Sequence, residues 1–313
     1  MNDRRDGQYQ FTSRISLDAP SSLQSVDVAF VGGGVDHRGV ASISALQGFA
    51  STVYRLRFDA VNQQTYINEK PVLREAFTKI FHQQKRIVLD ATTLGLGEIL
   101  QVLLVAKRLR CPRVEFLYAE PARYTRREGA VDFRMRDFSL TQNCHFQSVQ
   151  GFAHEYDPSM RAAHIFLLGF EPGRIRNAIE QRGDYDPDRY RFQMVIGVPA
   201  FQTGWESNSI RPHLAVLEDL EISERSIIYC QANSIRESYL TLWDLYRQLG
   251  DERGCFFVSP LGTKPHAVGA ALFLLETKGN EISTSLYYDH PERVIKRSSE
   301  IAAWHHVDVQ LSH

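Results

Sequence analysis

With 313 residues, of which 43% are apolar and 23% are charged, the chain has the composition of a globular protein, which excludes a disordered or fibrous class. This length accommodates two units of about 150 residues each. The formal net charge of −1 excludes the overall positive field that drives non-specific binding to nucleic acid.

The chain begins with a polar arm, residues 1–25, that lacks the apolar segment of a secretory signal. No apolar run reaches the roughly 18 to 20 residues that a membrane-spanning helix needs. The four cysteines lie far apart and form no CxxC pair, which disfavours both a disulfide framework and a structural zinc site. We therefore expect a cytoplasmic protein with reduced thiols.

The next segment, residues 26–157, alternates short β-rich runs with segments whose apolar residues recur at helical spacing. Strands are predicted over residues 26–31, 54–59, 86–90 and 114–119, and helices over residues 72–84 and 97–110. The second of these strands alternates in polarity, which is typical of an edge strand, and the last is expected to end at Glu120-Pro121. Residues 122–157 look irregular, with one short strand predicted at 145–149.

Residues 158–313 repeat this alternation. Strands are predicted over residues 164–169, 192–197, 226–230 and 255–259, and helices over residues 173–182, 210–220, 234–249 and 265–276. Two further β-rich runs, 283–288 and 303–311, flank a basic turn and are expected to form a terminal hairpin. Strands that alternate with helices need parallel crossovers. The predicted fold class is therefore α/β, with two Rossmann-like halves, mostly parallel sheets and an appended C-terminal β-hairpin.

The turn after the first predicted strand is rich in glycine. Ligands of open parallel sheets bind beyond the carboxyl ends of the strands. Glycines permit close backbone approach, and exposed amides beside an arginine would suit a phosphate. The spacing matches neither GxGxxG nor a P-loop, and an ordinary tight turn explains it equally well. The candidate ligand-binding residues of this turn are Gly32, Gly33, Gly34, Asp36, His37 and Arg38.

A carboxylate and two hydroxyl groups follow the strand predicted at residues 86–90. Asp90, Thr92 and Thr93 lie on the turn before a predicted helix. Any of them could cap that helix, and a cap is compatible with a ligand contact. Glu120, at the end of the next predicted strand, is a further candidate.

We give the most weight to the segment 262–266. Lys264 directly precedes Pro265, a residue type favoured at the first helical position. A cation there adds to the positive end of the helix dipole, which is costly unless an anion binds, although a solvated lysine is the alternative. Thr263 and Lys264 are candidate ligand-binding residues, and His266 is either a general acid or base or a structural histidine.

The pattern of strand, turn and helix recurs at residues 169–174. Glu171 and Arg174 are candidate ligand-binding residues there, with a mutual ion pair as the alternative. No GxSxG, HExxH or kinase-like motif is present, so the sequence specifies no catalytic residues. The adjacent His305 and His306 would point to opposite faces of a strand, which argues against a shared metal. We expect neither a cofactor nor a metal site.

The run from Ile87 to Thr93, with the apolar helix that follows it, resembles the strand, loop and helix of CRISPR-associated Rossmann fold sensor domains and their fused relatives in cyclic-oligonucleotide defence systems. In those families the strand-end loops bind a signalling nucleotide. By that resemblance Gly33, Asp36, Asp90, Thr92 and Thr93 would line such a pocket here. The sequence departs from the families in having no recognisable fused nuclease or winged-helix output domain.

Two of three functional hypotheses involve a phosphate-bearing small molecule. In the first, the chain is a nucleotide-sensing or partner-binding component of a prokaryotic antiviral defence system that binds its ligand at the strand-end loops. In the second, it is an enzyme acting on a nucleotide or a phosphorylated metabolite. The residues for that chemistry would be Asp90, Asp36 or Glu120 as general base and Lys264 or Arg38 to stabilise developing charge.

The third hypothesis is an interaction subunit. Its arginine-rich loop, residues 123–136, and its terminal hairpin would dock onto a protein or a nucleic acid. The nucleotide hypothesis instead requires the turns around Gly33, Asp90 and Lys264 to share one rim.

Overall fold

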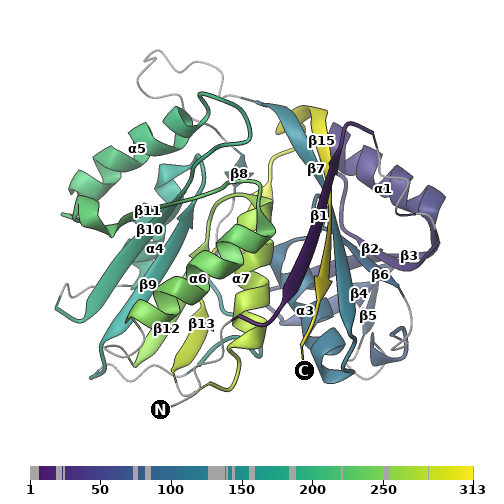
Figure 1. Cartoon of the computed structure of the whole chain (residues 1–313), viewed down its shortest axis with the longest axis horizontal. Coiled ribbons are helices and arrows are strands. Elements are labelled where there is room, and N and C mark those ends of the chain that lie inside the picture. The colour runs from purple at the N-terminus through teal and green to yellow at the C-terminus, as the bar shows by residue number, and fades with distance from the viewer. Residues whose placement is uncertain are drawn as a thin grey trace. The chain divides into compact units, whose positions relative to one another are not determined.

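The computed structural model divides the chain into two compact units (Figure 1). Its described residues are 7–18, 23, 25–72, 77–81, 86–125, 138, 140–142, 145–154, 159–182, 188–219, 221–249, 254–280 and 282–312. Unit 1 comprises residues 1–125 and 293–313, and unit 2 comprises residues 126–292. This division differs from the expected boundary between residues 157 and 158, because the last strand pairs with the sheet of unit 1.

Unit 1 is built on an eight-stranded sheet in the order β1-β15-β7-β6-β2-β3-β4-β5. Its strands are β1 (Gln10–Ser16), β2 (Val26–Val31), β3 (Ala50–Asp59), β4 (Gln64–Ile67), β5 (Lys70–Val72), β6 (Ile87–Asp90), β7 (Arg113–Tyr124) and β15 (Ser298–Gln310). The pairs β2–β3, β2–β6 and β6–β7 are parallel, and the other pairs are antiparallel. The helices α1 (His37–Phe49) and α3 (Leu96–Arg108) lie on the crossovers between parallel strands.

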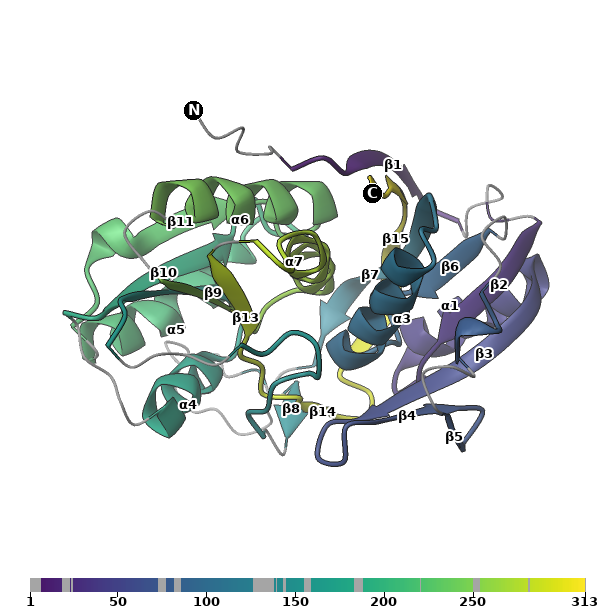
Figure 2. The same cartoon turned by 90° about the horizontal axis from the view of Figure 1, so that it is seen from below.

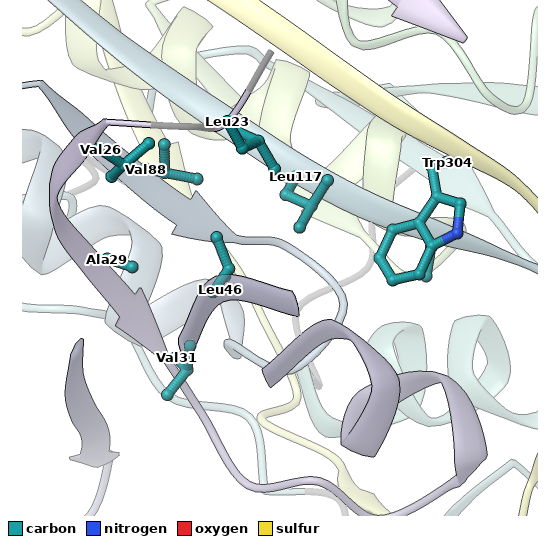
Figure 3. Packing of buried hydrophobic residues seen from close by; sticks show 9 residues of the cluster. Leu23, Val26, Ala29, Val31, Leu46, Val88, Leu117 and Trp304 are labelled. Carbon is teal, nitrogen blue, oxygen red and sulfur yellow. The ribbon is translucent and has the colours of Figure 1, made fainter. Parts of the chain in front are cut away.

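A buried apolar cluster joins α1 to the sheet of unit 1 (Figure 3). Leu46 of α1 is fully buried against side chains from β2, β6 and β7. The cluster consists of Leu23, Val26, Ala29, Val31, Leu46, Val88, Leu117, Ala119 and Trp304. Because Trp304 belongs to β15, the C-terminal strand contributes to the core of unit 1.

Unit 2 is built on a fully parallel five-stranded sheet in the order β11-β10-β9-β12-β13. Its strands are β9 (Ala162–Leu168), β10 (Tyr190–Gly197), β11 (Ile227–Cys230), β12 (Cys255–Pro260) and β13 (Ser283–Leu286). The connecting helices are α4 (Pro172–Arg182), α5 (Glu206–Asp219), α6 (Ile235–Leu249) and α7 (Lys264–Glu276). The helices α4 and α5 pack together, and α6 and α7 pack together on the opposite face of the sheet (Figure 2). Numbered along the chain, the strands have the 3-2-1-4-5 order of Rossmann folds.

Short elements complete the structure. A 3-10 helix, Glu224–Ser226, precedes β11, and β8 (Thr141–Gln142) pairs with β14 (Glu292–Arg293). Within the described residues, no helix combines the length and the apolar character that crossing a bilayer requires.

The α/β class with Rossmann-like parallel strands in both units is confirmed, but the expected terminal hairpin is wrong. The sheet of unit 2 is fully parallel, whereas the sheet of unit 1 is mixed, because β1, β15, β4 and β5 join it in antiparallel pairs. The strand β13 joins the parallel sheet of unit 2, whereas β15 pairs with β7 and β1 of unit 1. The predicted strand at residues 54–59 is not an edge strand either, because β3 lies between β2 and β4. Its alternating polarity reflects one face on which Leu56 is buried and an opposite face on which Arg55 and Arg57 are exposed.

The strand β7 runs past its expected end at Glu120-Pro121 and continues to Tyr124. Proline disfavours a central strand because it donates no hydrogen bond. Here the register of β15 shifts between Ile301 and Ala303, opposite Pro121, and this irregularity accommodates the proline.

Two further expected elements are only partly described. The helix expected at residues 72–84 lies largely outside the described residues, and Val72 ends β5. The strand expected at residues 145–149 is reduced to one bridge, between Gln147 and Tyr288. Most of the arginine-rich loop, residues 126–136, lies outside the described part of the chain.

The crossing of α6 and α7 depends on Gly269. A Cβ at this position would lie 2.7 Å from the carbonyl oxygen of Ile235 and 2.9 Å from the amide of Tyr239, both backbone atoms of α6. We expect Gly269→Ala to lower the free energy of unfolding by about 1–3 kcal/mol, because α6 must shift as a whole. Urea unfolding checks this, with Gly173→Ala as the control, since no atom lies within 4 Å of a Cβ at Gly173. Equal stability of the two variants would contradict the expectation.

Candidate functional site

Each sheet has one place where the helical crossovers leave neighbouring strands in opposite directions. In unit 1 this switch point lies between β2 and β6, and in unit 2 it lies between β9 and β12. Ligands of open α/β sheets bind at such points, beyond the carboxyl ends of the strands. Both edges are therefore candidate sites.

At the switch point of unit 2, two loops pack backbone against backbone. A Cβ at Gly262 would lie 2.6 Å from the carbonyl oxygen of Leu168, and one at Gly169 would lie 3.0 Å from the carbonyl oxygen of Leu261. The loops after β9 and β12 therefore meet without room for a side chain between them.

The charged residues of this edge are used internally. Arg174 is buried and donates from Nε and Nη2 to the two carboxylate oxygens of Asp289, at 2.6 and 2.5 Å, and from Nη1 to the carbonyl oxygen of Leu261 at 2.5 Å. Glu171 does not pair with Arg174 and instead accepts hydrogen bonds from Thr141, through its amide at 3.1 Å and its hydroxyl at 3.0 Å. We assign both residues to holding loops of unit 2 together.

The segment around Lys264 forms the start of α7. Thr263 caps the helix by accepting a hydrogen bond from the His266 amide, and its hydroxyl donates to the carbonyl oxygen of Ala232 at 2.6 Å. His266 is fully buried, its Nε2 donates to the carbonyl oxygen of Gln231 at 3.0 Å, and burial lowers its pKa to about 4. Because the imidazole is 0% exposed and holds the carbonyl oxygen of Gln231, we assign His266 a structural role. Lys264 is half-buried at the helix N-terminus.

At the switch point of unit 1, Asp90 is the centre of a closed hydrogen-bond network. Its side chain is 0% exposed and accepts from the Ser42 hydroxyl at 2.7 Å, the Thr92 amide at 3.0 Å and the Thr93 hydroxyl at 2.5 Å. The Thr93 hydroxyl in turn accepts from the Gly32 amide at 2.8 Å, which joins the loops after β2 and β6. Burial outweighs these hydrogen bonds and raises the pKa of Asp90 above its ordinary value.

The turn after β6 is also fixed from the C-terminal segment. Arg293 donates from Nη1 to the carbonyl oxygens of Thr92 and Thr93, at 2.9 and 2.8 Å, and from Nη2 to that of Leu94 at 2.5 Å. The N-cap of α3 is Gly95, with no side-chain cap, so neither Asp90 nor the threonines fill the expected capping role. We assign them a structural role in joining β2, β6 and β7.

A second polar cluster lies at the start of α1. Asp36 caps this helix, with Oδ1 accepting from the Gly39 amide at 2.9 Å and Oδ2 accepting from Arg38 Nη2 at 3.2 Å and from the Ser298 hydroxyl. Arg38 is 2% exposed and also donates to the Ser298 hydroxyl at 2.7 Å and to the carbonyl oxygen of Ala119 at 2.8 Å. Arg38 is therefore an interior residue and does not point into solvent.

Arg297 brings a second guanidinium to the same carboxylate. Its Nε is buried, lies 3.8 Å from Asp36 Oδ2 and has no hydrogen-bond partner among the described residues. Burial and the neighbouring Arg38 both lower the pKa of Arg297 below its ordinary value. Burial also raises the pKa of Asp36, but Arg38 and the donated hydrogen bonds outweigh it, so this carboxylate stays ionised at pH 7. Two guanidinium groups thus share one negative charge, and the cluster carries an excess of positive charge.

Exposed groups surround this cluster. The Lys296 amide donates to the carbonyl oxygen of Val35 at 2.9 Å, which attaches the C-terminal turn to the glycine loop after β2. Gly33, Gly34, His37 and Lys296 are exposed, and no atom lies within 4 Å of a Cβ built at Gly33. We call these four residues and Arg297 the basic rim.

The two adjacent histidines of β15 each pair with a different carboxylate of β7. His305 Nε2 lies 2.7 Å from Glu120 Oε2, and His306 Nε2 lies 2.6 Å from Glu115 Oε2. Glu115 and Glu120 differ in parity along β7 and therefore lie on opposite faces of the sheet. No group of three or more His, Cys, Asp or Glu side chains suited to a metal ion occurs in the described part of the chain.

The structure brings together some of the sequence-derived candidates and separates others. Gly32, Gly33, Gly34, Asp36, His37, Arg38, Asp90, Thr92, Thr93 and Glu120 belong to the carboxyl edge of the sheet in unit 1, and Glu171, Arg174, Thr263, Lys264 and His266 belong to unit 2. The expected rim therefore joins the glycine loop to the Asp90 turn within unit 1, while Lys264 belongs to the other unit.

Sequence reasoning did not place the C-terminal turn at this site. The sequence shows a basic turn at Arg293, Lys296 and Arg297, but no local pattern links that turn to Asp36 or to the carbonyl groups of residues 92–94. No protein-family model matches the chain, and no curated protein matches it.

Proposed function

We propose that unit 1 binds a phosphate-bearing ligand, of the nucleotide class, at the basic rim. The observation that carries the proposal is the sharing of Asp36 by Arg38 and Arg297. A buried cation without a full partner is costly, and an incoming anion would supply that partner. Guanidinium groups suit phosphate oxygens because they donate from a planar fork.

The neighbouring backbone supports the same ligand. Gly33 and Gly34 precede α1, and helix N-termini attract anions through their amides and the helix dipole. Asp36 already compensates Arg38 and caps the helix, so Arg297, Lys296 and the glycine amides are the groups left to meet a phosphate. The absence of a side chain at Gly33 leaves space for the ligand beside them.

Sensing is the form of this function that we favour over turnover. The second hypothesis uses Asp90, Asp36 or Glu120 as general base. Asp90 is 0% exposed and its carboxylate is occupied by internal hydrogen bonds. Asp36 caps α1 and accepts from Arg38, and Glu120 is buried beside His305. The resemblance of residues 87–93 to CRISPR-associated Rossmann fold sensors would make the ligand a signalling nucleotide and the chain a component of a prokaryotic antiviral defence system. The proposal of an anion site does not depend on that resemblance.

Isothermal titration calorimetry at low salt tests the proposal, with inorganic phosphate, adenosine mono- and triphosphate and cyclic oligonucleotides as probes. We expect Arg297→Met to weaken the best binder by about tenfold or more, which is about 1.4 kcal/mol. The control is Arg123→Met. Arg123 is exposed, and its ion pair with the exposed Glu300, at 4.0 Å, is a weak surface contact.

The same variant should not lose stability. Arg297 adds positive charge beside the buried Arg38, so methionine removes a repulsive neighbour along with the ligand contact. Urea unfolding of Arg297→Met should therefore give a free energy of unfolding at least equal to that of the parent. A folded parent protein that releases no heat with any probe, or equal binding by Arg297→Met and Arg123→Met, would overturn the proposal.

A further inference from the structure

The strand β1 is the terminal strand of the unit 1 sheet. Among the described strands it pairs with β15 alone, antiparallel, from Gln10 opposite Gln310 to Ser16 opposite Trp304. In such a ladder every second residue of an edge strand directs its N–H and C=O groups away from its neighbour. Five of the seven side chains of β1 are exposed, and those of Phe11 and Ser16 are partly buried.

The features that usually protect an edge strand are missing from β1. Natural sheets blunt long edges with lysine, proline, bulges or short strands. The sequence of β1, QFTSRIS, has no lysine or proline and a single charge, Arg14. Its pairing with β15 runs without a register shift. Ile15 is 65% exposed, and Leu17, just beyond the strand, is 82% exposed.

We propose that a second copy of this chain pairs with β1 through its own β1, antiparallel, about a two-fold axis at Ser13. Antiparallel pairing of identical strands closes with two-fold symmetry, so each copy uses the same surface. The result is one continuous sheet through both copies.

The charge and size of the side chains select this register. With the axis at Ser13 the whole strand is paired, Phe11 lies opposite Ile15, and Arg14 lies opposite Thr12. An axis at Arg14 would place two guanidinium groups directly opposite each other, which is destabilising. With a two-fold axis perpendicular to the sheet, each side chain lies opposite one on the same face. The axis must therefore pass through a residue position, and a register shifted by one residue, which would place opposite faces together, does not occur.

Cysteine crosslinking tests both the partner and the register. Paired residues on neighbouring strands have Cβ atoms about 4.5–5.5 Å apart, close to the range that a disulfide spans. Under mild oxidation, Ser13→Cys should form a covalent dimer, whereas Thr12→Cys and Arg14→Cys should do so only when mixed with each other. The parent chain controls for its own thiols, and Val61→Cys, at a residue 68% exposed in the same unit, controls for random collision.

Sedimentation velocity over a concentration series measures the reversible dimerisation of the chain without a crosslink. Ser13→Lys and Ser13→Glu should each weaken the dimer several-fold, and an equimolar mixture should restore it, because the like charges at the axis become opposite charges. The proposal is overturned if the parent chain is monomeric at every concentration, if it pairs only with a strand of a different protein, or if Ser13→Cys crosslinks no better than Val61→Cys.

Discussion

Arg174→Met is expected to lower the free energy of unfolding by about 3–5 kcal/mol, because it leaves Asp289 as a buried charge without a partner. Asp289 is 0% exposed, and Arg174 donates to its two carboxylate oxygens at 2.5 and 2.6 Å. The carbonyl oxygen of Leu261 loses its donor as well. The loop after β12 would then lose its hydrogen bond from Arg174 of α4.

A double-mutant cycle separates the unpaired charge from the lost packing. The combined change Arg174→Met with Asp289→Leu should cost less than Arg174→Met alone, since no charge remains buried. Tryptophan fluorescence in a Trp304→Phe background reports on unit 2, which holds the other two tryptophans, Trp205 and Trp243.

The same helix offers a matched control. Arg176 of α4 pairs with Asp219 at 2.6 Å, but these side chains are 44% and 61% exposed. Exposed ion pairs contribute about 0–1 kcal/mol, so Arg176→Met should change stability little. If Arg174→Met costs no more than Arg176→Met, the buried pair does not stabilise unit 2 as we infer.

Local patterns in the sequence were sufficient to predict most of the strands and helices. They missed α1, β4 and β5, and the segment expected to be a polar arm contains β1. The run Val26–Val31 ending at three glycines, and the apolar face of residues 97–110, each specify an element through neighbours a few positions away. The hairpin failed for the opposite reason. Residues 283–288 and 303–311 are both β-rich, but they do not pair with each other. The strand β13 pairs with β12 in unit 2, 28 residues earlier in the chain, and β15 pairs with β7 in unit 1. No local pattern in either run indicates which strand it pairs with.

The candidate site shows the same limit at the level of single side chains. Glu171 and Arg174 stand at a spacing that suggests a mutual ion pair, yet Arg174 pairs with Asp289, 115 residues away. Asp36 was predicted as a site residue, but its partner Ser298 lies 262 residues away. Burial also decided roles that sequence left open, since Asp90 and His266 could be reactive or structural until their exposure is known.

Mild acid is expected to destabilise unit 2 between pH 6.5 and pH 4. Burial lowers the pKa of both His213 and His266 from 6.5 to about 4. Their folded-state pKa values are depressed, so between pH 6.5 and pH 4 the unfolded chain binds protons that the folded chain does not. Stability is therefore fully present above pH 6.5 and is lost as pH falls to about 4. At 1.36 kcal/mol per pKa unit the loss is at most about 3 kcal/mol for each histidine.

Urea unfolding of the Trp304→Phe protein at pH 7.5, 6 and 5 measures this loss. Glu115 does not contribute to it, because the folded-state pKa of its carboxyl group is lowered to about 2 and the stability from that shift is lost only below pH 4.5. His213→Gln should reduce the slope of unfolding free energy against pH by as much as about 1.4 kcal/mol per pH unit, since one fewer proton is taken up on unfolding. The same variant at pH 7.5 is the control, because neither imidazole is charged there and only the lost packing is measured. A slope in His213→Gln equal to that of its parent would mean that this imidazole is solvated and titrates normally in the folded protein.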